Sequence, residues 1–258
     1  SDCRAIDWAS NGKFLVVADV KAKVYLLDAQ SLQVVSSLQS GFKQVEQGKG
    51  RPAIEPWVED IKIAPNCQLV ALGAHAGASN IEILGIANNK LQTKGVIKAG
   101  LTSALTHLDW SADCEFLVVN SQAYELKFSS VSTMKPVSAS SAKDIDWATW
   151  TCTLGFYSQG IFPACADGSD VNSVCRSSNR KVLATGDDFG KVNLFKYPSV
   201  VEKSLNKQYP GHSSHVTKVK FAFDDCYLVS TGGNDKAVIV WETDFGSGDQ
   251  NKPGGILE

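Results

Sequence analysis

The chain has 258 residues, enough to bury the core of one large β-domain or of two small domains. Its net charge of −2 comes from 25 basic and 27 acidic residues, whereas general nucleic-acid or membrane-surface binders usually carry an excess of positive charge. No run of about 18 apolar residues is present, and the start SDCRAIDWAS lacks the regions of a signal peptide, so we expect neither a membrane span nor a secretory leader.

Cysteine usage indicates a reducing compartment. The chain has seven cysteines, an odd number, and Cys67, Cys114, Cys175 and Cys226 fall in or beside apolar runs. Buried reduced thiols explain this distribution, so we expect a cytoplasmic location.

Short apolar runs repeat along the chain. DW-ASNGK-FLVV at 7–17 and DW-SADCE-FLVV at 109–119 share two elements at the same spacing. Five units align on the last residue of a predicted first strand, at Trp8, Ile63, Trp110, Cys175 and Phe221. Second strands are then predicted around 15–17, 70–72, 117–119, 182–184 and 228–230, and third strands around 24–27, 81–84, 124–128, 192–195 and 238–241. This pattern predicts an all-β chain of stacked antiparallel blades.

Two segments interrupt the repeat. Residues 40–56 are polar and rich in Gly and Pro, which predicts a long loop. Residues 137–170 contain Asp146-Trp147, a third copy of the first-strand motif, but no ordinary blade follows, so we expect an irregular partial blade there.

We therefore predict a β-propeller over 1–243, with about five regular blades, and a flexible Gly-rich tail over 244–258. The predicted last blade lacks an outer strand, so we expect the ring to be completed by chain outside this sequence or by a partner.

Residues 211–243 resemble a WD repeat, the four-stranded blade of a β-propeller. The resemblance implies that His212, Ser230, Asp235 and Trp241 form a buried hydrogen-bonded network that supports the blade. The alternative is a hydrolase triad, but no Gly-x-Ser-x-Gly elbow is present.

The cysteines lack the close spacing of a zinc site, and no glycine loop has the phosphate-binding pattern. We expect no catalytic residues, no metal and no cofactor.

The irregular segment is unusually rich in aromatic residues. They are Trp147, Trp150, Phe156, Tyr157 and Phe162. Packing against a neighbouring blade is the simpler interpretation, and partner binding is the alternative, because exposed aromatic residues concentrate at interfaces.

Residues 143–218 carry strings that are more specific than a generic WD repeat. They include DWAT at 146–149, LGF at 154–156, VCR at 174–176, TGDDFGKV at 185–192 and GHSSHV at 211–216. These strings, with THLDWS at 106–111, resemble the echinoderm microtubule-associated protein-like family over roughly residues 1–243. The resemblance implies the second of two fused propellers, with one atypical blade, and association with microtubules.

The leading functional hypothesis is a non-catalytic, microtubule-associated propeller that binds tubulin, alone or with other cytoskeletal or axonemal proteins. Its loops would present basic groups to the acidic microtubule, and Lys43, Lys49 and Arg51 on the long loop are the candidates. The alternative is a generic scaffold in signalling or a ubiquitin ligase that does not bind tubulin. Neither hypothesis involves nucleic acid or a membrane.

Overall fold

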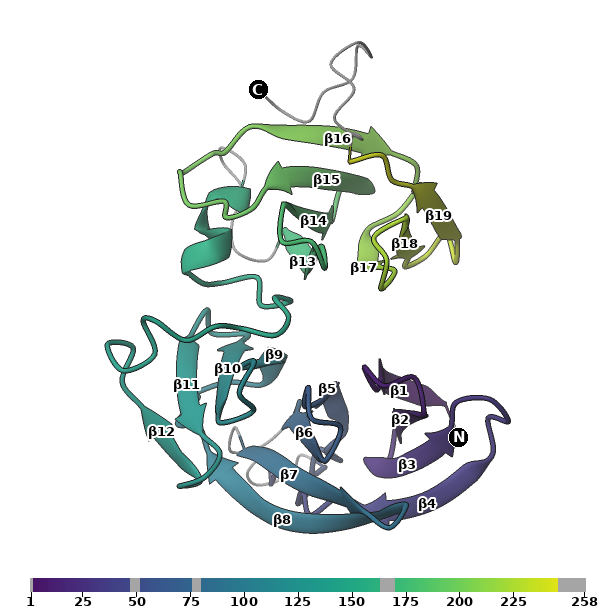
Figure 1. Cartoon of the computed structure of the whole chain (residues 1–258), viewed down its shortest axis with the longest axis vertical. Coiled ribbons are helices and arrows are strands. Elements are labelled where there is room, and N and C mark those ends of the chain that lie inside the picture. Colours follow the sequence, from purple (N-terminus) through teal and green to yellow (C-terminus); the bar gives the residue numbers. More distant parts are fainter. Residues whose placement is uncertain (1, 47–51, 76–79, 163–169, 246–258) are drawn as a thin grey trace. The chain divides into compact units, whose positions relative to one another are not determined.

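The computed structural model describes residues 2–46, 52–75, 80–162 and 170–245. Within these ranges the regular structure consists of 19 β-strands and one short 3-10 helix, and the strands form five antiparallel sheets (Figure 1). The chain divides into two compact units, Ser1–Ala148 and Thr149–Glu258. None of the described helical residues forms a helix long and apolar enough to cross a membrane.

The first unit contains three four-stranded sheets, in which consecutive strands pair. The first sheet consists of β1 (Cys3–Trp8), β2 (Phe14–Asp19), β3 (Lys23–Asp28) and β4 (Val34–Gln39). The second consists of β5 (Val58–Ile63), β6 (Leu69–Ala74), β7 (Asn80–Ala87) and β8 (Lys90–Lys98). The third consists of β9 (Leu105–Trp110), β10 (Phe116–Ser121), β11 (Leu126–Ser130) and β12 (Lys135–Val137).

The second unit starts with the 3-10 helix η1 (Phe156–Ile161), followed by two sheets. The four-stranded sheet consists of β13 (Val171–Arg176), β14 (Val182–Asp187), β15 (Lys191–Lys196) and β16 (Asn206–Pro210). The last sheet consists of β17 (Val216–Phe221), β18 (Tyr227–Gly232) and β19 (Val238–Glu242). Among the described residues no fourth strand pairs with β19.

The five predicted blades are confirmed as five sheets. Predicted first strands end where β1, β5, β9 and β17 end, and β13 extends one residue further, to Arg176. One boundary was wrong: β11 begins at Leu126 rather than at Tyr124. Tyr124 has a φ of 59° and its N–H donates to the Ser121 carbonyl, so it closes the preceding turn instead of extending the strand.

The apolar cores lie between neighbouring sheets. Val16 and Leu26 of the first sheet share one buried cluster with Ile61 and Leu72 of the second. A separate cluster joins the second sheet to the third, and another joins the two sheets of the second unit. Because central sheets are covered on both faces, their strands are apolar nearly throughout rather than alternating, as β6 shows with five buried residues out of six.

Polar side chains connect the first strands of neighbouring sheets. In each case a backbone N–H of one sheet donates to a side-chain oxygen of the sheet before it: Ile63 to Asp7 (2.8 Å), Leu108 to Asp60 (2.9 Å) and Val219 to Ser173 (3.1 Å). These strands lie at sheet edges, where a buried N–H without a partner would be costly. The bonds therefore give these N–H groups of the edge strands an acceptor, and they fix how adjacent sheets align.

Lys62 is a buried cation in this network. Its Nζ lies 3.1 Å from Asp60 Oδ1, and both side chains are less than 10% exposed. Burial alone would lower the pKa of the Lys62 ammonium. The negative charges of Asp60, Asp7 and Asp109 outweigh this effect and hold the pKa well above its ordinary value. Lys62 therefore remains charged, and its charge balances part of the carboxylate cluster.

Cysteine burial differs in part from the prediction. Cys114, Cys152 and Cys175 are buried, and the six described cysteines are all free thiols. Cys226 is exposed, so its predicted burial was wrong, because the residue lies in the turn before β18 rather than inside the strand.

Replacing Asp60 with alanine should destabilise the first unit by about 3 kcal/mol, because it leaves the Leu108 N–H without its acceptor and Lys62 without its closest counter-ion. Urea unfolding followed by circular dichroism measures the change. Glu115→Ala, at an exposed carboxylate of the same unit, is the control and should stay within about 0.5 kcal/mol of the parent. Equal stability of the two variants would contradict the role assigned to Asp60.

Candidate functional site

The predicted polar network assembles in the last sheet. His212 precedes β17, Ser230 lies on β18, Asp235 lies in the turn before β19, and Trp241 lies on β19. His212 Nδ1 is 3.0 Å from Asp235 Oδ2, and His212 Nε2 is 2.8 Å from Ser230 Oγ. The Trp241 Nε1–H donates to the same Ser230 oxygen at 2.8 Å. The structure thus brings all four residues into one chain of contacts.

The geometry fits support rather than nucleophilic chemistry. Ser230 is fully buried, and its hydroxyl oxygen is occupied by the Trp241 N–H and the His212 ring. A nucleophile must be reached by its substrate, and this hydroxyl faces the interior. The contacts instead tie the segment before β17 to the turn between β18 and β19.

Asp235 carries the charge of the network. Burial would raise the pKa of its carboxyl, but N–H donors from Ala237, His212 and Ser213 outweigh this effect and hold the pKa below its ordinary value. Two of these contacts are Ala237 N to Oδ1 at 3.2 Å and Ser213 N to Oδ2 at 3.1 Å. The ionised form is therefore the one that the fold stabilises.

Trp147 belongs to the first unit. It is 3% exposed, pairs with Ser111 in an isolated β-bridge, and its ring centroid lies 5.9 Å from that of Phe128. The next residue, Ala148, donates its N–H to the Trp110 carbonyl. An isolated bridge therefore attaches the repeated Asp-Trp motif next to β9 of the third sheet, and its tryptophan is buried.

Trp150 organises the start of the second unit. It is 2% exposed, and its Nε1–H donates to Ser158 Oγ at 3.2 Å. Tyr157 sets its ring edge-on against Trp150, with centroids 5.0 Å apart, and stacks on Tyr197 at 5.7 Å. A β-carbon at Gly155 would lie 2.4 Å from the Trp150 ring, so this position requires glycine.

The aromatic set thus divides by exposure. Trp147 and Trp150 are buried, Tyr157 and Phe162 are half-buried, and Phe156 is 63% exposed. The burial of the two tryptophans agrees with the simpler interpretation, packing, rather than with the alternative of partner binding. A binding role stays a proposal chiefly for Phe156.

The predicted basic loop is only partly described. Lys43 is exposed, whereas Lys49 and Arg51 lie outside the described residues. The loop is anchored at its base, where the Gly41 N–H donates to Glu82 Oε2 on β7 at 2.8 Å. Val45 and Ile54 bridge across it.

Strand β8 carries positive charge that sequence reasoning missed. Lys90, Lys94 and Lys98 are all exposed. Lys94 falls where the pairing of β7 with β8 shifts register, so the three lysines do not follow a simple alternation. The signal available in the sequence was a lysine at every fourth residue, at 90, 94 and 98, shortly after the predicted third strand at 81–84.

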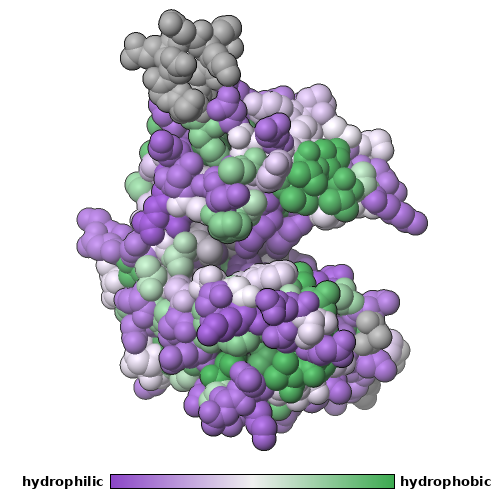
Figure 2. Space-filling view, turned by 45° about the vertical axis from the view of Figure 1, so that its right-hand side comes forward, coloured by the Kyte–Doolittle hydropathy of each residue, from purple (hydrophilic) through white to green (hydrophobic). Residues whose placement is uncertain are grey.

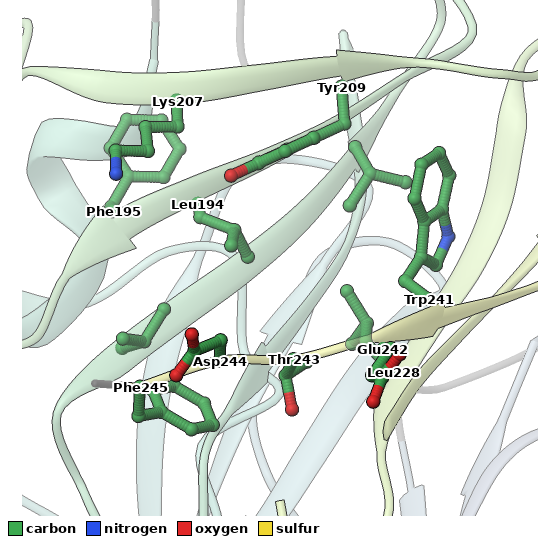
Figure 3. Close-up of a pocket in the computed structure, with 12 residues that line it drawn as sticks. Leu194, Phe195, Lys207, Tyr209, Leu228, Trp241, Glu242, Thr243, Asp244 and Phe245 are labelled. Atoms are coloured by element: carbon green, nitrogen blue, oxygen red, sulfur yellow. The ribbon is translucent and has the colours of Figure 1, made fainter. Parts of the chain in front are cut away.

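A groove opens in the second unit beside β19 (Figure 3). Leu194 of β15 and Lys207 and Tyr209 of β16 line one side, and Leu228 and Trp241 line the other. Phe245 follows β19 and closes one end, and the cavity has a volume of about 120 Å³. The lining is mainly apolar, with negative charge from Glu242 and Asp244 and positive charge from Lys207.

No cluster of three or more His, Cys, Asp or Glu side chains able to hold a metal ion occurs in the described parts of the chain.

Comparison with known proteins gives one consistent family. The model of the echinoderm microtubule-associated protein second beta-propeller matches residues 1–243. Mouse echinoderm microtubule-associated protein-like 1 is 38% identical over 233 residues, which are 90% of this chain and 27% of that protein. Mouse echinoderm microtubule-associated protein-like 2 is 35% identical over 239 residues, 92% of this chain and 35% of that protein. The chain therefore spans about a third or less of these relatives.

A solved structure shares the fold. A chain in the crystal structure of the mitotic checkpoint complex superposes with a TM-score of 0.66, covering 93% of this chain and 74% of that chain. Its sequence identity is 16%, so the similarity concerns the fold alone.

Replacing Ser230 with alanine should destabilise the second unit by about 2 kcal/mol, because the Trp241 N–H and the His212 ring both lose their partner. Chemical unfolding followed by tryptophan fluorescence measures the change. Ser132→Ala, in a turn of the first unit, is the matched control. A Ser230→Ala variant as stable as this control would contradict a supporting network.

The Asp235 carboxylate should make the last sheet sensitive to acid. Its folded-state pKa is below the ordinary value of about 3.9, so its stabilisation is complete above about pH 4 and is lost as the pH falls through the folded-state pKa. The difference in unfolding midpoint between the parent and Asp235→Asn should therefore shrink between pH 5 and pH 2. A constant difference across this range would show that the charge of Asp235 contributes nothing to the stability of the fold.

Proposed function

Because the chain belongs to the echinoderm microtubule-associated protein family, we propose that it is a non-catalytic, microtubule-associated component of the cytoskeleton that binds tubulin through its surface. The family match over residues 1–243 carries this proposal. The chain spans only part of its relatives, so the proposal concerns what this segment contributes. We place it in the cytoplasm on microtubules, including stable arrays such as those of the axoneme, without a nucleic-acid or membrane partner.

Electrostatics support a contact with tubulin, whose surface is acidic. In the first unit, Lys90, Lys94 and Lys98 present three charges along β8, and Lys43 adds one on the long loop. Exposed charges of this kind mainly steer association and fix orientation, and salt screens them. The proposed binding is therefore strongest at low ionic strength. Phe156 of the second unit is a separate, apolar candidate contact.

A general scaffold that does not bind tubulin is the second candidate. One face of the last sheet favours it, because Tyr227, Val238 and Val240 are each about half exposed or more, at 48%, 66% and 60%. Apolar groups gathered on one sheet face are typical of protein–protein interfaces. A set of captured partners that lacks tubulin would favour this candidate.

The chain should pellet with polymerised tubulin at low ionic strength and be released as salt is added. Reversing three charges with Lys90→Glu, Lys94→Glu and Lys98→Glu should weaken binding about tenfold, since each exposed ion pair contributes roughly 0.2–1 kcal/mol. Cosedimentation over a range of microtubule concentrations gives the affinities.

The matched control reverses three exposed lysines of the second unit, Lys196, Lys203 and Lys236, which changes the net charge equally. An equal loss of microtubule affinity in both triple variants would exclude a specific role of β8 in binding. If the parent chain stays in the supernatant at every microtubule concentration, the proposed function is wrong.

A further inference from the structure

Strand β7 contains a glycine where the third strands of the other four sheets carry a side chain. Gly85 pairs with Leu69, the first residue of β6. The matching positions, each opposite the first residue of a second strand, are Asp28, Ser130, Lys196 and Glu242. Glycine inside a strand lowers stability, because it loses more chain entropy on folding and packs no side chain. A specific contact therefore has to account for the glycine in β7.

The backbone at Gly85 does not require glycine. Its φ is not positive, unlike those of Gly12 and Gly100, so other residues can adopt its conformation. What excludes a side chain is Lys94 of β8, whose stem crosses Gly85. A β-carbon at Gly85 would lie 3.2 Å from Lys94 Cγ and closer still to Cε. Gly85 thus leaves room for the stem of Lys94.

A β-bulge brings Lys94 to this position. Thr93 pairs with Leu84 and Gly95 pairs with Ile83, which leaves Lys94 between them without a partner on β7. Bulges bend a strand locally and redirect its side chains. The residue as a whole remains exposed. A lysine of this kind packs its stem on the protein and keeps its charged end in water, where a partner can reach it.

This packing prepares Lys94 for binding. A lysine side chain loses rotamer freedom when a partner fixes it, and this loss opposes association. The stem of Lys94 is already restricted by its contact with Gly85, so less freedom remains to be lost. Its ammonium group should therefore contribute more to an ion pair with a partner than that of a freely moving surface lysine does.

Lys90 lies on the same face of the sheet as Lys94. It pairs with Ala87, two residues from Gly85 on β7, and alternate residues of a strand share a face. This face is turned toward the third sheet, because Ile83 belongs to the cluster that joins the second and third sheets. The two lysines therefore approach the rim of that seam.

The third sheet adds a lysine beside these two. Figure 1 places β8 and β12 side by side, and the two strands are in contact. Met134, in the turn before β12, packs against Gly95 of β8, with its Cε 3.3 Å from where a β-carbon of Gly95 would lie. Lys135 follows at the start of β12 and is exposed. Lys90, Lys94 and Lys135 thus gather along the seam between the second and third sheets.

Positive charge is the main property of this cluster. Within the described ranges none of the three lysines forms an ion pair. Figure 2 shows mainly hydrophilic residues along the lower margin of the view, at the height where Figure 1 places β8. A partner that matches this surface presents several carboxylates close together.

We propose that Gly85 is a positioning residue, and that Lys94, whose stem it accommodates, is the principal contact of the first unit with an acidic segment of the microtubule surface. Lys90 and Lys135 extend the same contact along the seam. The inference rests on the proposed function and names the residues and the partner chemistry through which β8 acts.

Gly85→Ala tests the proposal, because the added methyl group displaces the flexible end of Lys94 without removing its charge. The variant should be at least as stable to urea as the parent, since alanine loses less chain entropy than glycine. Its affinity for polymerised tubulin, measured by cosedimentation at low salt, should fall about threefold, and that of Lys94→Ala about fourfold. The double variant should also lose about fourfold, because Gly85 acts only through Lys94.

Lys98→Ala is the matched control. It removes the same charge from the same strand, but Lys98 pairs with Asn80 and lies on the face opposite to Gly85, so affinity should fall less than about twofold. Equal affinities of Gly85→Ala and the parent would overturn the proposal. So would a loss of about twelvefold in the double variant, which indicates two independent effects, or equal losses in Lys94→Ala and Lys98→Ala.

Lys94→Met separates charge from packing, since it keeps an apolar stem over Gly85. It should be as stable as the parent and should bind microtubules about fourfold more weakly. Unchanged affinity of this variant would contradict the role of the Lys94 charge, whatever the stability of Gly85→Ala.

Fluorescein-labelled poly-L-glutamate tests the chemistry of the partner by anisotropy at low salt. It should bind the parent and bind Gly85→Ala and Lys94→Ala more weakly, in the same order as microtubules do, whereas poly-L-glutamine should not bind. Equal binding of poly-L-glutamate to all three, with a parent that pellets with microtubules, would overturn this inference and leave the proposed function standing. The expected order with poly-L-glutamate, but a parent that never pellets, would overturn the proposed function and assign the lysines to another acidic partner.

Discussion

Each inner sheet of this chain has two apolar faces, and neither is stable in water, so a sheet must be packed between neighbours. In the second sheet, Val70 and Leu72 face the cluster shared with the first sheet, while Ala71 and Ile83 face the cluster shared with the third. The hydrophobic effect thus acts between sheets rather than within them. This requirement sets the order of the sheets and leaves the turns and outer strands to vary.

Close stacking of sheets creates a second requirement, because it takes most of the first strand of an inner sheet, such as β5 or β9, out of water. The side chains of Asp7, Asp60 and Ser173 meet it by accepting backbone N–H groups of the following sheet. Lys62 then compensates the negative charge that two of these acceptors bring into the interior. Near the turn before β19, the buried hydroxyl of Ser230 pairs with the ring of His212 and with the N–H of the half-buried Trp241.

The sequence was sufficient to predict the five sheets, because each repeats the same spacing of short apolar runs between turns, from Trp8 to Phe221. The resemblance of residues 211–243 to a WD repeat also predicted the members of the polar network, His212, Ser230, Asp235 and Trp241. Features that depend on distant contacts were not predictable. Packing of Trp147 and Trp150 was the simpler interpretation of the sequence, but their partners Ser111, Phe128 and Ser158 were not predictable. The groove beside β19 depends on the absence of a fourth strand among the described residues. The role of Asp60 was equally hidden, because its partner Leu108 lies 48 residues away.

The central claim is that the third strand of each sheet, β3, β7, β11 and β15, is paired on both sides, whereas β19 is paired on one side only among the described residues. Hydrogen exchange measured residue by residue tests it directly on the whole chain. Backbone amides of β15, which is paired on both sides, should be protected throughout, while alternate amides of β19 should exchange much faster, since they point away from β18. Uniform protection along β19, equal to that of β15, would show that this edge is already covered and would contradict the account.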